Sequence, residues 1–205
     1  FSLYSEQLKQ RLDPSVTILQ GINSKIKKNQ KTVVFADGED ENTLKAAIAF
    51  KNSGLGTPII VAKENVVKER LKEIGYGENL DIQIVNSTNK EMRDKYVKLL
   101  FKKMHRDQGL LERDCDRMIR TDRVIWASCM VECGDADAMV TGNTRRYSQS
   151  LEKIKKVIPA RLGEIMFGLN MVVSKGKTVF IGDTSVNEYP TSEELADIAI
   201  SSARV

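Results

Sequence analysis

Short β-branched and apolar runs alternate with helical stretches through the first part of the chain. Apolar runs at residues 32–36, 57–62 and 82–86 predict strands, because they are short and rich in valine and isoleucine. Helical patterns occupy residues 41–53 and 64–74 between them. Strands that alternate with helices at this spacing form βαβ units around a parallel sheet. We therefore expect a three-layer α/β/α domain with a mainly parallel sheet.

A fourth apolar run, at residues 138–140, follows a set of three predicted helices. These helices are expected near residues 90–104, 110–119 and 122–132, and a further helix is expected over residues 147–157. We expect residues 138–140 to form a buried strand, because the run is apolar and too short for a helix. This run would add one more strand to the parallel sheet.

Small polar residues follow directly after this fourth apolar run, as Thr141, Gly142, Asn143 and Thr144. In open α/β sheets, ligands bind in the crevice outside the carboxyl ends of the strands. Glycine lets a ligand approach the backbone closely, and its neighbours offer hydroxyl and amide groups to an anion. We expect these four residues to contact a ligand; the alternative is an ordinary turn between a strand and a helix.

The pattern changes after Pro159. Apolar residues 163–173 and 178–183 predict two strands, and the short connection between them favours an antiparallel hairpin. Thr191 and Glu194 form a capping box, so a helix should begin there. One hairpin and one helix bury too little apolar surface to close a core alone. We interpret this part as the start of a second α/β subdomain.

A second group of candidate binding residues follows the last predicted strand. Asp183, Thr184 and Asn187 lie where that strand ends, and their alternative role is hydrogen bonding within the turn. Arg145 and Arg146, near the first group, could bind phosphates in a bidentate manner. Salt bridges at the surface are the alternative for these two arginines.

The composition limits the classes of protein to consider. Hydrophobic residues at 41% and charged residues at 29% are typical of a soluble globular protein, without a signal peptide or membrane segment. The odd number of cysteines favours reduced thiols in the cytoplasm over disulfides or a metal site. Lysine clusters without aromatic residues argue against nucleic-acid binding. We expect His105, the only histidine, at the solvated surface.

Three stretches, at residues 33–39, 134–144 and 178–199, resemble the phosphotransacetylase (phosphate acetyl/butyryl transferase) family, in the same order. The resemblance implies a two-part α/β fold of the isocitrate/isopropylmalate-dehydrogenase-like group. It also implies a cleft that binds acetyl-CoA or CoA, with Thr141 to Thr144 and Asp183 among the contacts.

A narrower group, the bacterial hybrid NADP-dependent malic enzymes, has a C-terminal domain that fits better. Residues 6–14 resemble the linker into that domain, and Asn170, Asp183 and Asn187 also resemble the hybrid type. The resemblance implies a domain cut from a longer cytoplasmic enzyme. It would bind acetyl-CoA, regulate the malic-enzyme catalytic domain in cis, and assemble as a homo-oligomer. NADP and Mg²⁺ or Mn²⁺ would bind only before residue 1.

The sequence also departs from active transferases. Their catalytic serine, arginine and aspartate would fall beyond Val205, and Glu152 stands where the family has an arginine. An acidic group is electrostatically wrong for acetyl phosphate. We therefore expect no catalytic residue in this chain; the alternatives are an active phosphate acetyltransferase and a module for assembly.

The expected division of the chain has three parts. Residues 1–30 would be linker and entry helices, residues 31–146 the first subdomain, and residues 147–205 an incomplete second subdomain.

Overall fold

The computed structural model describes residues 14–76, 81–174 and 177–204. By their contacts, residues 26–159 form one compact unit, and the residues on either side of this range form another. The helix expected over residues 4–12 lies outside the described residues. None of the described helices is long and apolar enough to cross a membrane.

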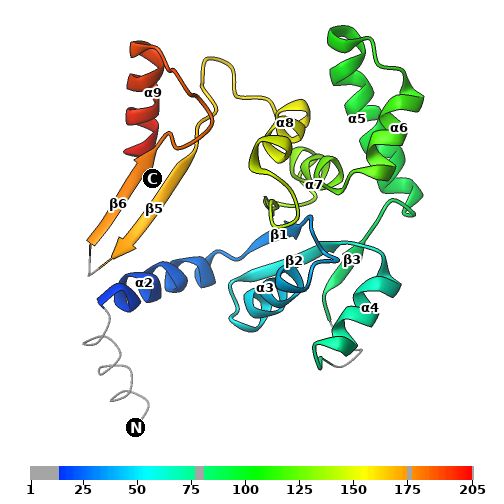
Figure 1. The fold of residues 1–205 in the computed structure, drawn as a ribbon, viewed down its shortest axis with the longest axis horizontal. Coiled ribbons are helices and arrows are strands. Elements are labelled where there is room, and N and C mark those ends of the chain that lie inside the picture. Colours follow the sequence, from blue (N-terminus) through cyan, green and yellow to red (C-terminus); the bar gives the residue numbers. More distant parts are fainter. Residues whose placement is uncertain (1–13, 77–80, 175–176, 205) are drawn as a thin grey trace. The chain divides into compact units, whose positions relative to one another are not determined.

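A parallel sheet in the strand order β3-β2-β1-β4 forms the centre of the first unit (Figure 1). The strands are β1 (Lys31–Phe35), β2 (Gly56–Val61), β3 (Gln83–Val85) and β4 (Ala138–Val140). The parallel sheet predicted from the sequence is therefore confirmed. Because all four strands run in one direction, their carboxyl ends meet at one edge of the sheet, and the loops after β1 and β4 are neighbours.

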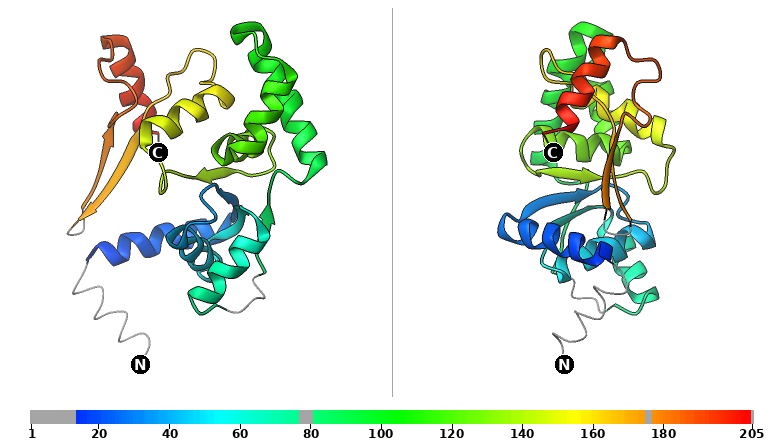
Figure 2. Two further views of the ribbon diagram at one scale, coloured as in Figure 1. Left: turned by 45° about the vertical axis from the view of Figure 1, so that its right-hand side comes forward. Right: turned by 90° about the vertical axis from the view of Figure 1, so that its left-hand side faces the viewer.

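Helices cover both faces of this sheet, as the alternation of its side chains requires (Figure 2). Val34 and Val61 pack into one core, whereas Phe35 and Ile60 pack into a second core on the other face. The first core is closed by α5 (Lys90–Gln108), α6 (Glu112–Thr121), α7 (Arg123–Glu132) and α8 (Tyr147–Val157), and the second by α3 (Glu41–Asn52) and α4 (Glu64–Glu73). The expected three-layer arrangement is confirmed.

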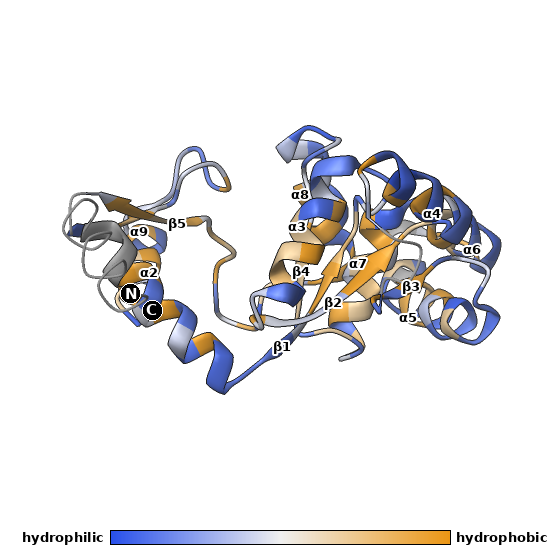
Figure 3. Ribbon diagram, turned by 90° about the horizontal axis from the view of Figure 1, so that it is seen from below, coloured by the Kyte–Doolittle hydropathy of each residue, from blue (hydrophilic) through white to orange (hydrophobic). Residues whose placement is uncertain are grey.

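Hydrophobic residues are concentrated on the strands between these helices (Figure 3). Trp126 of α7 is the largest fully buried side chain in the first core and is only 1% exposed. Its ring meets that of Tyr96 edge to face, with the ring centroids 5.0 Å apart. Phe35 lies in the second core, and its ring makes a similar edge-to-face contact with Phe50, which packs against that core.

The strand at residues 138–140 is not buried, contrary to the expectation from its sequence. Ala138 and Val140 are both exposed, and Val140 keeps 47% of its surface accessible. Among the described residues β4 is the end strand of the sheet and pairs with β1 alone. The burial of a short apolar run depends on its place in the sheet, which the run itself does not reveal.

The second unit contains an antiparallel hairpin and two helices. β5 (Leu169–Ser174) pairs with β6 (Lys177–Gly182), and the helices are α9 (Ser192–Ser202) and α2 (Pro14–Lys28), which belongs to this unit as far as Lys25. Thr191 and Glu194 exchange the two hydrogen bonds of a capping box at the start of α9. The predicted hairpin and capping box are confirmed.

The contacts divide the chain after Pro159, whereas the division drawn from the sequence began the second subdomain at residue 147. Helix α8 packs on α7, and its last residue, Val157, is fully buried in the first core. This helix therefore belongs to the first unit by its packing.

Candidate functional site

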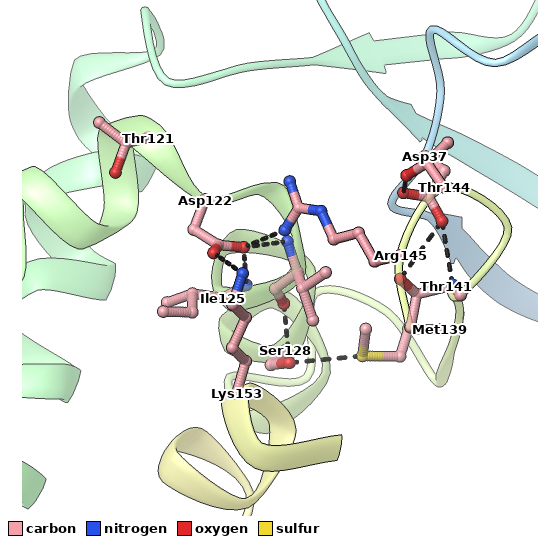
Figure 4. A network of polar contacts seen from close by, with 12 residues as sticks. Asp37, Thr121, Asp122, Ile125, Ser128, Met139, Thr141, Thr144, Arg145 and Lys153 are labelled. Atoms are coloured by element: carbon pink, nitrogen blue, oxygen red, sulfur yellow. Dashed lines mark hydrogen bonds and ion pairs between the residues drawn. The ribbon is translucent and has the colours of Figure 1, made fainter. Parts of the chain in front are cut away.

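A single buried carboxylate organises the loop that follows β4. Asp37 is the second residue after β1 and is only 5% exposed. Its carboxylate accepts hydrogen bonds from the backbone nitrogens of Gly142 at 3.0 Å and Asn143 at 3.2 Å. The hydroxyl groups of Thr144, at 2.6 Å, and Thr141, at 3.4 Å, donate to the same carboxylate (Figure 4). All four residues predicted from the first loop therefore surround Asp37.

The pairing of β1 with β4 explains this meeting. Phe35 lies opposite Val140 in the parallel register, and the nitrogen of Ala36 donates to the Val140 carbonyl at 3.0 Å. The residue after Ala36 is Asp37, so its side chain reaches the start of the loop. Two adjacent backbone N–H groups that could hold an anionic ligand are thus directed at an anion of the protein itself.

Asp40 fixes the same loop to helix α3. Its carboxylate caps the helix by accepting from the nitrogen of Thr43 at 2.9 Å, and it also accepts from the side-chain amide of Asn143. The hydrogen bond from Thr43 is the main reason that the pKa of Asp40 lies below its usual value. Asn143 is therefore held by two separate carboxylates.

One side of the loop borders a cavity of about 470 Å³. Its lining is mostly apolar and comes from β4, the loop and α8: Met139, Val140, Thr141, Gly142, Tyr147, Ser150, Leu151 and Ile154. Gly142 has a φ of 107°, which strains any other residue, and the space beside its Cα is open. The Ser150 hydroxyl is buried and has no hydrogen-bond partner among the described residues. The cavity thus combines an apolar wall, an open glycine and one unsatisfied polar group.

The second predicted group repeats this design in the second unit. The carboxylate of Asp183 accepts from the backbone nitrogens of Gly168, Ser185, Val186 and Asn187 at 2.9 to 3.2 Å. Burial acts to raise the pKa of Asp183, but the bonds from Gly168 and Val186 help to hold it below its usual value.

The other two predicted residues of the second group have partners within the same unit. The Asn187 amide donates to the Asp183 carboxylate and to the Met166 carbonyl, and the Thr184 hydroxyl accepts from Asn170. The seven predicted residues therefore form two clusters, one around Asp37 and one around Asp183. Sequence reasoning missed the role of Asp37, although the acidic turn after the first strand was the available signal.

Arg145, considered for a phosphate, forms a salt bridge instead. Its guanidinium lies 2.9 Å from the carboxylate of Asp122, which also binds Lys153 and caps α7 through the nitrogen of Val124 (Figure 4). Burial acts to raise the pKa of Asp122, but Lys153 and Arg145 hold it below its usual value. Asp122 thereby joins the start of α7 to the loop and to α8.

His105 is exposed, as expected, and its Nδ1 lies 3.1 Å from the Leu110 carbonyl. In the part of the chain that the structure describes, no cluster of histidine, cysteine, aspartate and glutamate could hold a metal ion.

Comparison with known proteins places these features in a family. Residues 17–205 match the sequence profile of the family described as phosphate acetyl/butaryl transferase. The chain belongs to this family. A phosphotransacetylase from Streptococcus pyogenes has a similar structure, with a TM-score of 0.77 and 26% identity over 90% of this chain and 56% of that one.

Curated relatives of this family member include two kinds of enzyme, malic enzymes and phosphate acetyltransferases. An NADP-dependent malic enzyme of Rhizobium meliloti is 40% identical over 197 residues, which are 96% of this chain and 26% of the relative. A phosphate acetyltransferase of Helicobacter pylori is 26% identical over 97% of this chain and 38% of the relative. The chain therefore spans about a quarter of the malic enzyme that it resembles.

Glu152 is exposed on α8 of this phosphate acetyl/butaryl transferase family member. Its carboxylate pairs with Lys156 at 2.8 Å, and this contact is the main reason that its pKa lies below the usual value. The position therefore presents a paired negative charge to solvent.

The substitution Asp37→Asn tests the carboxylate that holds the loop. An amide keeps the size but loses one acceptor and the charge, so we expect the free energy of unfolding to fall by about 2 kcal/mol. Urea denaturation measures this loss, and amide hydrogen exchange should accelerate at Gly142 and Asn143. The exposed Asp81→Asn is a matched control and should change neither quantity. Unchanged exchange at the two loop amides would contradict the assigned role.

Asp122 should make the stability depend on pH in the acid range. Its pKa in the folded protein lies below the ordinary 3.8, so its salt bridges stabilise the fold fully above that value. The stabilisation is lost as the pH falls through the folded pKa. We expect Asp122→Asn to be less stable than the parent chain at neutral pH and the difference to shrink below pH 3.8. A difference that stays constant across a series of urea titrations would contradict this account.

Proposed function

We propose that this chain is the phosphotransacetylase-like domain of an NADP-dependent malic enzyme, where it binds acetyl-CoA as a regulatory signal. The observation that carries the proposal is the 40% identity to a malic enzyme over nearly the whole chain, against 26% to a phosphate acetyltransferase. Oxidation of malate, with its NADP and Mg²⁺ or Mn²⁺, would belong to the remainder of such an enzyme. A cytoplasmic location fits the free cysteines.

The cavity beside Gly142 supports a thioester ligand. Its apolar wall suits the acyl group and the arm that carries the thioester, and the unsatisfied Ser150 hydroxyl offers a polar contact. Thr141 and Gly142 line the cavity directly. In this proposal Asn143 and Thr144 shape the loop through Asp40 and Asp37. Asp183, Thr184 and Asn187 stay a separate predicted group of ligand contacts within the second unit.

A regulatory role fits better than catalysis of phosphate transfer. The loop nitrogens that could hold acetyl phosphate already bind Asp37, so a second anion would have to displace a buried carboxylate. Glu152 adds a further negative charge on α8. The active phosphate acetyltransferase remains the second candidate, because relatives of that name match almost the whole chain.

Regulation requires coupling between two sites. If acetyl-CoA binds this domain and lowers malate oxidation by changing substrate binding, malate and NADP must weaken acetyl-CoA binding by the same factor. The reciprocal effect is what distinguishes a sensor from a domain that merely binds CoA.

An additional role in assembly is favoured by the β5–β6 hairpin. Met171, Val172, Val179, Phe180 and Ile181 each keep between 43% and 54% of their surface exposed. In the antiparallel register Met171 lies opposite Phe180 and Val172 opposite Val179, so both faces of the hairpin carry exposed apolar residues. We propose that a second copy of the chain covers one of them.

Acetyl-CoA should bind the chain, and Val140→Glu should weaken binding about tenfold, because it places a carboxylate in the apolar cavity. Val140 is half exposed, so the change should leave the fold intact. Isothermal titration measures the affinity, and Leu111→Glu is the control, because Leu111 is 45% exposed in the same unit and does not line the cavity. In the intact malic enzyme, acetyl-CoA should inhibit malate oxidation.

Absence of binding, or equal loss in both variants, would contradict the acetyl-CoA site. Formation of acetyl-CoA from acetyl phosphate and CoA by the intact protein would instead favour the transferase.

Assembly through the hairpin should make the molecular mass depend on concentration. Light scattering coupled to size exclusion should show a dimer or larger species for the chain, and Phe180→Glu should shift it towards the monomer, because a charge cannot be buried unpaired in such an interface. Leu111→Glu, exposed in the first unit, is the matched control. A monomer at all concentrations would contradict the assembly role.

A further inference from the structure

A second cavity, of about 330 Å³, lies at the carboxyl ends of β2 and β3. Lys63, which follows β2, forms one wall, Asn86 and Ser87 after β3 form another, and the connection from α6 to α7 closes the third with Arg120 and Arg123. None of the residues that line the first cavity takes part. The position is the usual one for a ligand of a parallel sheet, on strands that the proposed acetyl-CoA site does not use.

Positive charge exceeds negative charge around this cavity. Arg123 pairs with Glu39, and Arg120 lies 3.5 Å from Asp116 while its side chain remains 59% exposed. Lys63 makes no side-chain ion pair with any residue that the structure describes. Asp122, the carboxylate in the lining, already binds both Arg145 and Lys153. The cations of this region therefore outnumber the carboxylates, which favours an anion over a metal ion.

A helix N-terminus and one buried donor without a partner also point to an anion. Helix α4 begins at Glu64, and the side chain of its N-cap, Lys63, does not cap the first turn. The backbone nitrogen of Lys63 donates to the carboxylate of Glu39 at 3.3 Å, so one anionic group of the protein already lies at this helix end. Trp126 lines the cavity and is only 1% exposed. Its indole Nε1 has no hydrogen-bond partner among the described residues. A buried donor of this kind is normally satisfied by an acceptor that occupies the site.

We propose that this cavity binds the phosphate group of a small phosphate ester. Lys63 and Arg120 would supply the charge, while the first turn of α4 and the Trp126 indole would donate hydrogen bonds to the phosphate oxygens. The volume accepts a phosphate or diphosphate with a small attached group. The site does not depend on the proposed acetyl-CoA site, because the two cavities have no residue in common.

Trp126 is the only tryptophan of the chain, so its fluorescence reports on this cavity alone. Pyrophosphate titrated at constant ionic strength should produce a saturable change in emission, with isothermal titration as a second measurement. Arg120→Ala should raise the dissociation constant about tenfold, the usual effect of losing one charge-assisted contact. Arg113→Ala, exposed on the same helix, is the matched control and should leave the constant unchanged.

Equal weakening in the two arginine variants, or no saturable signal by either method at millimolar pyrophosphate, overturns the proposal. Val140→Glu should leave pyrophosphate binding intact, which separates this site from acetyl-CoA recognition. Two further probes identify the source of the phosphate. Tighter binding of adenosine 3′,5′-bisphosphate than of pyrophosphate, lost in Arg120→Ala, supports a nucleotide ligand. Equal binding of both, lost in the same variant, supports recognition of the phosphate group alone.

Discussion

The buried carboxylate of Asp37 is the interaction on which the candidate site depends. It fastens the end of β1 to the loop after β4 through two backbone nitrogens, of Gly142 and Asn143, and two hydroxyl groups. A loop of small polar residues would otherwise have many conformations of similar energy. The carboxylate selects one of them, in which Gly142 borders the apolar cavity. The shape available to a ligand is therefore set by a residue that the ligand need not touch.

Asp183 shows that this arrangement is not confined to one loop. In each unit an aspartate that follows a strand gathers backbone N–H groups that would otherwise be free to bind an anion. The chain thus supplies its own anion at both strand ends, which leaves only the remaining surfaces for the ligands that we propose. Around the first loop these surfaces are apolar, whereas the cavity near Arg120 is cationic. The first cavity therefore suits an apolar group of a ligand, and the second suits an anionic group.

Local sequence patterns were sufficient to predict the helices and strands but not which of them pack against one another. The strands and the capping box at Thr191 depend on residues close in sequence, and both were predicted. The exposure of Val140 and the role of Asp37 depend on the pairing of β1 with β4, which no local pattern encodes. The place of α8 likewise depends on packing, since Val157 enters a core that is formed mostly by preceding residues. Sequence reasoning therefore found the loop without finding what holds it.

The bond between Asp37 and Gly142 closes a span of 105 residues. Contacts of such long range form only after much of the chain between them has been ordered, because closing a long loop costs entropy. The loop beside the cavity therefore acquires its shape only when the sheet itself has closed. A loop in the conformation held by Asp37 therefore indicates that the helices between β1 and β4 are already packed on the sheet.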